Sequence, residues 1–103
     1  MGGEKMSYLA KLKQHKPFDI PDDTLEVLFY ELGEVSKCVH HIRNFPLEKV
    51  GYRGYLLTAI ADAYAQLITL AQWYDFSLVE VQHLAWERFV EKMETTFPLE
   101  GRQ

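Results

Sequence analysis

The chain has 103 residues and a formal net charge of -4, which suggests one domain and argues against a general nucleic-acid binder, since such proteins are usually basic. Apolar residues make up 48% and charged residues 25%, an ordinary balance for a soluble globular protein. Cys38 is the sole cysteine, so no internal disulfide is possible, as is typical of a cytoplasmic protein. The acidic balance still allows a small anionic substrate, because a metal ion can bridge two negative partners.

The amino-terminal segment carries no secretory apolar core, and Met6 stands where the myristoylation pattern needs Ser or Thr. We therefore expect a cytoplasmic location. Residues 1–6 are expected to be flexible, a short helix is expected over about residues 5–14, and residues 16–21 form a connection.

The first long helix is predicted to start at Pro21 and run to about Arg43. Proline suits a first helical turn, and Asp22 and Asp23 suit the positive end of the helix dipole. Apolar residues then recur at helical spacing: Leu25, Leu28, Phe29, Leu32, Val35, Val39 and Ile42. Residues 44–53 are predicted to form a loop.

The second long helix is predicted from about Gly54 to Tyr74, and Asp62 is its only charged residue. The stretch is long enough to span a bilayer, yet its polar residues argue against that and favour a buried helix of a soluble protein. Those residues are Asp62, Gln66, Gln72, Thr58 and Thr69.

A third long helix is predicted over about residues 78–95. Ser77 is a suitable N-cap, and Glu80 three residues later completes a capping box. Its apolar stripe comprises Leu78, Val81, Leu84, Ala85, Phe89 and Met93. The tail from residue 97 to 103 is expected to be flexible.

The predicted architecture is all-α: one domain over residues 1–103, an antiparallel bundle of three long helices with a short amino-terminal helix. The middle helix is apolar nearly all round, so it needs cover on most sides, and a chain this short has few helices to supply it. We therefore expect dimerisation, or tetramerisation, through helices. Alanines that permit close helix approach are Ala59, Ala61, Ala63 and Ala65.

Three carboxylates are predicted to converge between the two central helices. An isolated carboxylate in an apolar setting is costly unless it is paired or binds a metal, and Asp62 is such a residue. Glu31 and Glu34 are neighbours on one face of the preceding helix. With the predicted boundaries, Glu34 lies about 13 Å and Asp62 about 12 Å from the connecting loop. An antiparallel pair would therefore bring Glu34 level with Asp62, and Glu31 level with Gln66.

A hard divalent cation would resolve the repulsion among these carboxylates, because oxygen ligands are what Mg²⁺ accepts. Two simpler arrangements stay open. In one, the two glutamates form a solvated helix face; in the other, a salt bridge satisfies the aspartate. The basic residues near the hairpin end are Arg43, Lys49 and Arg53.

The order of these residues resembles the MazG-like all-α nucleoside triphosphate pyrophosphohydrolases. Their pattern is E-E-x-x-E, a spacer of a dozen to nearly thirty residues, and then E-x-x-D. Glu31 and Glu34 match the second and third Glu, the spacer runs over residues 35–58, and Asp62 in ADAYAQL matches the final Asp. The similarity covers roughly residues 25–84.

The chain departs from the family pattern at two of its acidic positions. Tyr30 replaces the first Glu, and Ala59 replaces the Glu of E-x-x-D. The lysine and asparagine that the family often carries in its last helix are not evident. Gln66 or a water molecule would then complete the shell of the ion, acting beside the ligands. A degenerate site is the alternative.

The resemblance implies hydrolysis of a nucleoside triphosphate to monophosphate and pyrophosphate, with Mg²⁺, or alternatively Mn²⁺, as cofactor. It assigns Glu31, Glu34 and Asp62 as catalytic metal ligands. Arg43, Lys49 and Arg53 are candidates to stabilise the phosphate charge, although loops between helices often carry solvated basic residues. The alternative is a dimeric helical module that has lost catalysis and binds nucleotide or protein. Neither a nucleic acid polymer nor a membrane is expected as a partner.

Other candidate sites are weaker. His40 and His41 are adjacent on a helix and so do not converge on one ion. His83 and Glu87 lie one turn apart, a spacing that could chelate zinc, but an ordinary polar face is the simpler interpretation. Cys38 lacks an activating triad, and a buried or half-buried thiol is expected. The aromatic residues near the last connection are expected in the core: Trp73, Tyr74, Phe76 and Trp86.

Overall fold

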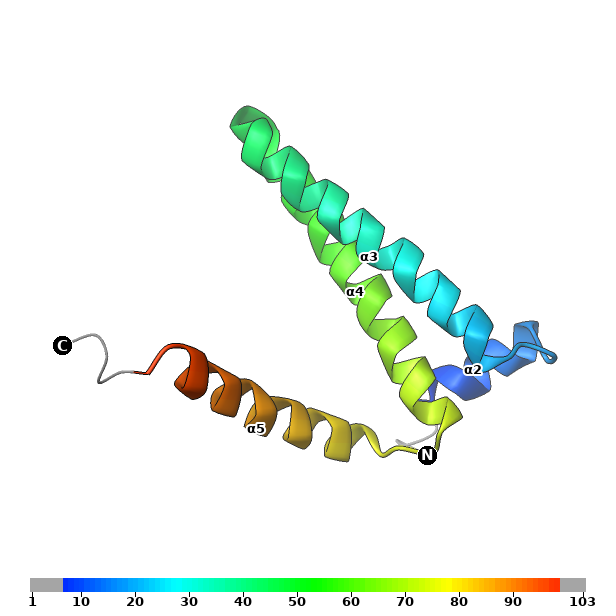
Figure 1. Ribbon diagram of the computed structural model, residues 1–103. Coiled ribbons are helices and arrows are strands. Elements are labelled where there is room, and N and C mark those ends of the chain that lie inside the picture. The colour runs from blue at the N-terminus through cyan, green and yellow to red at the C-terminus, as the bar shows by residue number, and fades with distance from the viewer. Residues whose placement is uncertain (1–6, 99–103) are drawn as a thin grey trace.

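The computed structural model describes residues 7–98, and this range contains helices and no strand. The elements follow one another along the chain in Figure 1 as α2 (Tyr8–His15), α3 (Pro21–Asn44), the short 3₁₀ turn η1 (Pro46–Glu48), α4 (Lys49–Trp73) and α5 (Leu78–Thr96). The all-α class is confirmed. The segments predicted to be flexible lie outside the described residues, apart from residues 97 and 98.

The helix starts follow local chemistry. Ser7 caps α2 by accepting a hydrogen bond from the backbone N–H of Ala10 at 3.2 Å, and Ser77 caps α5 by accepting one from Glu80 at 3.3 Å. Helix α3 has no side-chain cap, but proline occupies its first turn with two aspartates. Acidic groups there offset the exposed N–H groups and the positive end of the dipole.

Helix α4 begins at Lys49, five residues before the predicted start at Gly54. Pro46 and Gly51 favoured a loop up to residue 53, because glycine costs about 1 kcal/mol in a helix. Gly51 and Gly54 both lie inside α4, where a Cβ would meet nothing within 4 Å, so neither glycine is required by close packing. The turn of η1 already reverses the chain, and α4 contacts α3 from its first turn, where Tyr52 stacks on His41.

Helices α3 and α4 form an antiparallel pair, and the small core lies between them (Figure 1). Leu28 and Cys38 are buried from α3, and Ala59, Ala63 and Ile68 are buried from α4. Small alanine side chains allow the two backbones to approach closely, which suits a long, narrow interface.

Hydrogen bonds fasten the open end of the hairpin. Trp73 Nε1 donates to Oγ1 of the buried Thr24 at 3.1 Å, joining α4 to the start of α3. The backbone N–H of Leu9 donates to Gln72 Oε1 at 2.8 Å, and Lys13 Nζ lies 4.5 Å from the centre of the Trp73 ring. These contacts tie α2 to the end of α4.

Helix α5 leaves the hairpin instead of packing alongside it (Figure 1). Its contacts are with α4, and they include a hydrogen bond of 3.1 Å from the Gln82 side-chain amide to the Tyr64 hydroxyl. The three-helix bundle is therefore not confirmed within the single chain. Dimerisation stays a prediction.

The expectation that the middle helix is covered on most sides is not met within one chain. Helix α3 covers one side of α4, while apolar residues on the other side stay exposed, among them Leu57, Ile60 and Leu67. Among the described residues, the segment Val50–Trp73 is long and apolar enough to cross a membrane by length and composition, and 22% of an 18-residue apolar stretch within it is buried. Most of the surface of α4 is therefore not covered within this chain.

Candidate functional site

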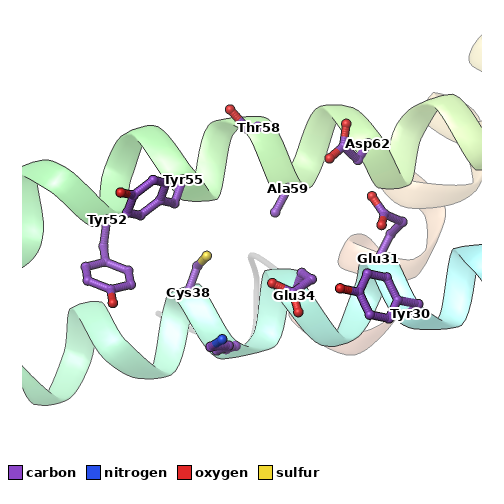
Figure 2. Close-up of a pocket in the computed structure, with 10 residues that line it drawn as sticks. Tyr30, Glu31, Glu34, Cys38, Tyr52, Tyr55, Thr58, Ala59 and Asp62 are labelled. Atoms are coloured by element: carbon purple, nitrogen blue, oxygen red, sulfur yellow. The ribbon is translucent and has the colours of Figure 1, made fainter.

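A groove of about 600 Å³ runs between α3 and α4, within the size range of small-molecule sites. Its lining includes the three carboxylates that were predicted as metal ligands, Glu31, Glu34 and Asp62 (Figure 2). The groove is lined by Tyr30, Glu31, Glu34, Lys37 and Cys38 from α3, and by Tyr52, Tyr55, Thr58, Ala59 and Asp62 from α4.

The helix register places Glu31 opposite Asp62. Glu31 lies 13 residues before the end of α3 at Asn44, and Asp62 lies 13 residues after the start of α4 at Lys49. Both are therefore about 20 Å from the connection, and Figure 2 shows their side chains pointing toward one another. The predicted register, with Glu34 level with Asp62, was one turn off because α4 starts earlier than predicted.

The same register places Glu34 opposite Ala59. Glu34 lies ten residues before the end of α3, and Ala59 lies ten residues after the start of α4. The Ala59 methyl group is 7% exposed and points into the groove toward Glu34 (Figure 2). The position where the resembling family carries a fourth carboxylate is therefore inside this groove.

The pKa of Glu31 is raised above its ordinary value of 4.5. Burial is the largest cause, followed by the negative charge of Asp62 and a hydrogen bond with its carboxyl group, and then by the charge of Glu34. The groove thus holds more negative charge than its surroundings neutralise. A proton relieves this, and so would a bound cation.

The carboxylates do not form a closed metal cage. Within residues 7–98, no group of three or more His, Cys, Asp or Glu side chains is arranged closely enough to hold a metal ion. Glu31 and Asp62 form a pair, with Glu34 one turn away along α3. The donor chemistry suits Mg²⁺, which accepts carboxylate oxygens and keeps several waters, so two protein carboxylates and water ligands are a sufficient set.

Asp62 is exposed at the mouth of the groove, which answers how a charge is tolerated in an apolar helix. The ion pairs of the described part of the chain leave Asp62 without a basic partner: they join Lys16 to Asp19, His41 to Glu48, and His83 to Glu87. Water around the open side of α4 therefore solvates Asp62. A salt bridge does not satisfy this aspartate in the chain as described.

Lys37 is the cation that lines the groove among the described residues, and it was not predicted from the sequence. Its spacing of three from Glu34 was the available signal, because residues three apart share a helix face.

The basic residues that were predicted to contact phosphate lie elsewhere. Arg53 lines a separate cavity between α3 and α4, where Ile42 of α3 meets Leu57 and Ile60 of α4. Arg43 is exposed in the last turn of α3, and the Lys49 side chain lies outside the described residues. Gln66 lies one turn beyond Asp62 and is not among the described residues that line the groove.

Tyrosines form the end of the groove nearest the hairpin turn. The Tyr52 and Tyr55 rings meet edge to face at 5.3 Å, and His41 stacks on Tyr52 at 3.7 Å while its Nε2 lies 2.8 Å from Glu48 Oε1. Neither tyrosine was predicted from the sequence. Tyr55 lies four residues before Ala59, and Tyr52 lies seven residues before it. These spacings place both tyrosines on the same helix face as Ala59, a signal that was readable from the sequence.

The weaker candidate sites are occupied by local contacts. The Asn44 amide contacts the His40 ring and donates to the His40 carbonyl at 2.8 Å. His83 Nε2 lies 3.1 Å from Glu87 Oε2 on the exposed face of α5. Cys38 is a free, buried thiol, as expected.

Comparison with protein-family models, curated proteins and solved structures finds no match to this chain. The resemblance to the MazG-like enzymes thus rests on the order and spacing of the acidic residues.

Proposed function

We propose that this protein is a Mg²⁺-dependent nucleoside triphosphate pyrophosphohydrolase. The observation that carries the proposal is the pairing of Glu31 with Asp62 in a groove that also holds Glu34. The spacing of these residues resembles that of the MazG-like enzymes, in which carboxylates on two helices hold Mg²⁺. The protein would act in the cytoplasm on a free nucleotide, with neither a nucleic acid polymer nor a membrane as a partner.

In this proposal Glu31 and Asp62 would hold the ion, with Glu34 as a further carboxylate of the same groove. Bound Mg²⁺, or Mn²⁺ in its place, would neutralise phosphate oxygens and help to position the attacking water. Water adds to the α-phosphorus, the bond from that phosphorus to the α,β-bridging oxygen breaks, and pyrophosphate leaves. A carboxylate of the groove accepts the proton of the water.

Other groove residues suit the rest of a nucleotide. Lys37 carries the positive charge that a triphosphate requires beyond the ion. Tyr55 lies seven residues before Asp62, two helical turns or about 10 Å along the groove, and offers an aromatic face for the base. Arg43, Lys49 and Arg53 stay secondary candidates for phosphate contacts.

The test is to incubate the purified protein with each dNTP and NTP in the presence of Mg²⁺ and to separate the products. Monophosphate and pyrophosphate are expected in equal amounts, and no free orthophosphate. Glu26→Gln provides a matched control, because Glu26 is an exposed acid of the same helix outside the groove. Absence of turnover with every nucleotide, together with no Mg²⁺ binding by calorimetry, would contradict the proposal.

A second candidate is a helical module that keeps the fold and has lost catalysis. Ala59 favours it, because this buried methyl group stands opposite Glu34 where a fourth carboxylate would close the site. Nucleotide binding by calorimetry without any product would select this module over the enzyme.

A further inference from the structure

A chain of contacting side chains at the hairpin turn connects Tyr55 in the groove to Glu48 outside it. It passes from α4 to the last turns of α3 and on to η1, through Tyr55, Tyr52, His41 and Glu48 in that order. We name these four residues the hairpin cluster. Two of them, Tyr52 and Tyr55, line the groove at the end remote from Asp62 (Figure 2).

The orientation of Tyr55 depends on its neighbour Tyr52. Tyr55 is 64% exposed on the surface of α4, and an exposed side chain moves among its rotamers unless a neighbour restricts it. Among the described residues, the ring that contacts Tyr55 is that of Tyr52, edge to face at 5.3 Å with 78° between the planes. The ring face that Tyr55 offers to a nucleobase is therefore set by the position of Tyr52.

Tyr52 is in turn held by the opposite helix. The imidazole of His41 stacks on its ring at a centroid distance of 3.7 Å, with 18° between the planes. Phe45, one turn further along the chain, contacts the same imidazole at 4.5 Å. The position of Tyr52 therefore depends on where His41 stands.

Glu48 fixes the rotation of the His41 ring. Its Oε1 lies 2.8 Å from His41 Nε2, and because an ionised carboxylate only accepts, Nε2–H is the donor. The side chain of Glu48 is 59% exposed, so this hydrogen bond contributes little to the stability of the fold. Its effect is to select one orientation of the imidazole that stacks on Tyr52.

We infer that His41 is a positioning residue for the nucleobase and acts through Tyr52 and Tyr55. The inference rests on the proposed function, in which the base binds on Tyr55. The hairpin cluster fixes the Tyr55 ring before the nucleotide binds, so binding does not have to immobilise that side chain. Loss of His41 should therefore weaken the contact with the base and leave the contacts of the phosphates with the ion and Lys37 unchanged.

The first test measures dissociation constants by calorimetry with Mg²⁺, using α,β-imido-dATP and α,β-imido-dCTP, which resist cleavage between the α- and β-phosphates. His41→Ala should weaken binding of the analogue that wild type prefers by about fourfold, the scale of immobilising one side chain. The dissociation constant of tripolyphosphate, which has no base, should not change. An unchanged constant for the analogue, or an equal loss for tripolyphosphate, would overturn the inference.

A double variant tests whether His41 acts through Tyr55. Tyr55→Ala alone should weaken binding of the analogue about fivefold. Adding His41→Ala to it should cause no further loss, because the ring that His41 positions is then absent. A loss of about twentyfold in the double variant, the product of the two single effects, would mean that His41 acts independently and would overturn the inference.

His41→Phe is the conservative replacement, because it keeps a flat ring against Tyr52. It should bind the analogue within twofold of wild type, and binding as weak as that of His41→Ala would overturn the stacking argument. His40→Ala is the matched control and should bind like wild type. His40 is exposed on the same helix and contacts Asn44 of that helix.

Circular dichroism checks that each variant stays helical. If His41→Ala does not, Glu48→Ala replaces it in the double-variant test, since Glu48 is exposed and its loss removes the hydrogen bond alone. The loss of affinity should then be smaller, and Tyr55→Ala should again abolish it. A loss that persists in the Tyr55→Ala background would overturn the inference.

Failure of the proposed function gives a different result. Wild-type protein that binds an analogue but releases no monophosphate from any dNTP or NTP would contradict the enzyme, while the binding measurements would still decide the role of His41. Wild-type protein that binds neither analogue would overturn both.

Discussion

The two sides of α4 differ in what they leave unsatisfied. On the side toward α3, Asp62 pairs with Glu31 of α3 next to buried alanines, and this carboxylate pair has no basic partner among the ion pairs of the described residues. The opposite side carries large apolar side chains that stay partly exposed, from 41% at Tyr64 to 70% at Leu57. Excess charge in a groove calls for a cation or a ligand, whereas excess apolar surface calls for a protein partner. The two sides of one helix therefore differ in chemistry: one has excess negative charge and the other has excess exposed apolar surface.

The largest effect expected on the groove side is that of Asp62→Asn. Loss of one carboxylate from the pair removes a ligand worth several kcal/mol to a metal-dependent reaction, so turnover should fall by at least about a thousandfold. The helical content should stay unchanged, because Asp62 is exposed and is not part of the buried core. Product analysis and circular dichroism on the same preparation measure both, and unchanged turnover in Asp62→Asn would show that Asp62 is not part of the site.

Ala59→Glu should increase the Mg²⁺ affinity of the groove by adding a fourth carboxylate. The new side chain would stand opposite Glu34, and added ligand charge tightens binding of a divalent cation, here by about tenfold. The same variant without Mg²⁺ should be less stable, since a further negative charge is forced into a buried position. Ala61→Glu is the control, because Ala61 is exposed on α4 and does not line the groove. Calorimetric titration with Mg²⁺ decides, and equal affinities for the two variants would contradict the geometry.

Tyr55→Ala should affect nucleotide binding more than the chemical step. Stacking of a base on an exposed ring contributes about 1 kcal/mol, so KM should rise roughly fivefold with kcat little changed. Tyr74→Ala is the control, because Tyr74 is similarly exposed at the other end of α4. A fall in kcat at constant KM would indicate that Tyr55 acts on the reacting phosphate instead.

The helices were predictable because local signals marked their ends, and the pairing register was not. Pro21 and the following aspartates fixed the start of α3, and its observed end differs from the prediction by one residue. The start of α4 was missed because Pro46 and Gly51 are typical of a loop, and contacts with α3 override that preference. Five residues at one boundary were enough to change the partner of Asp62 from Glu34 to Glu31.

The candidate site was predictable in its carboxylates and not in the rest of its lining. A charge within an apolar helix is conspicuous in a sequence, whereas Lys37 and Tyr55 are ordinary residue types that gain meaning only from the face they share. The departure of α5 was not predictable either. An amphipathic pattern states that one face must be covered, and it does not state whether the same chain covers it.

The smallest expected effect is a pH-dependent change in stability that arises in the groove. Because the pKa of Glu31 is raised in the folded protein, the folded state binds more protons than the unfolded state between 4.5 and that raised value. The contribution of Glu31 to the stability of the metal-free protein should therefore become more favourable as the pH falls through this window, while Mg²⁺ affinity falls because the proton competes with the ion. Glu31→Gln should raise the free energy of unfolding at neutral pH by less than about 1 kcal/mol, since water in the open groove screens the repulsion. Urea unfolding of wild type and variant with EDTA, across the window at fixed protein concentration, measures the difference, and a wild type that loses stability relative to Glu31→Gln on acidification would contradict the raised pKa.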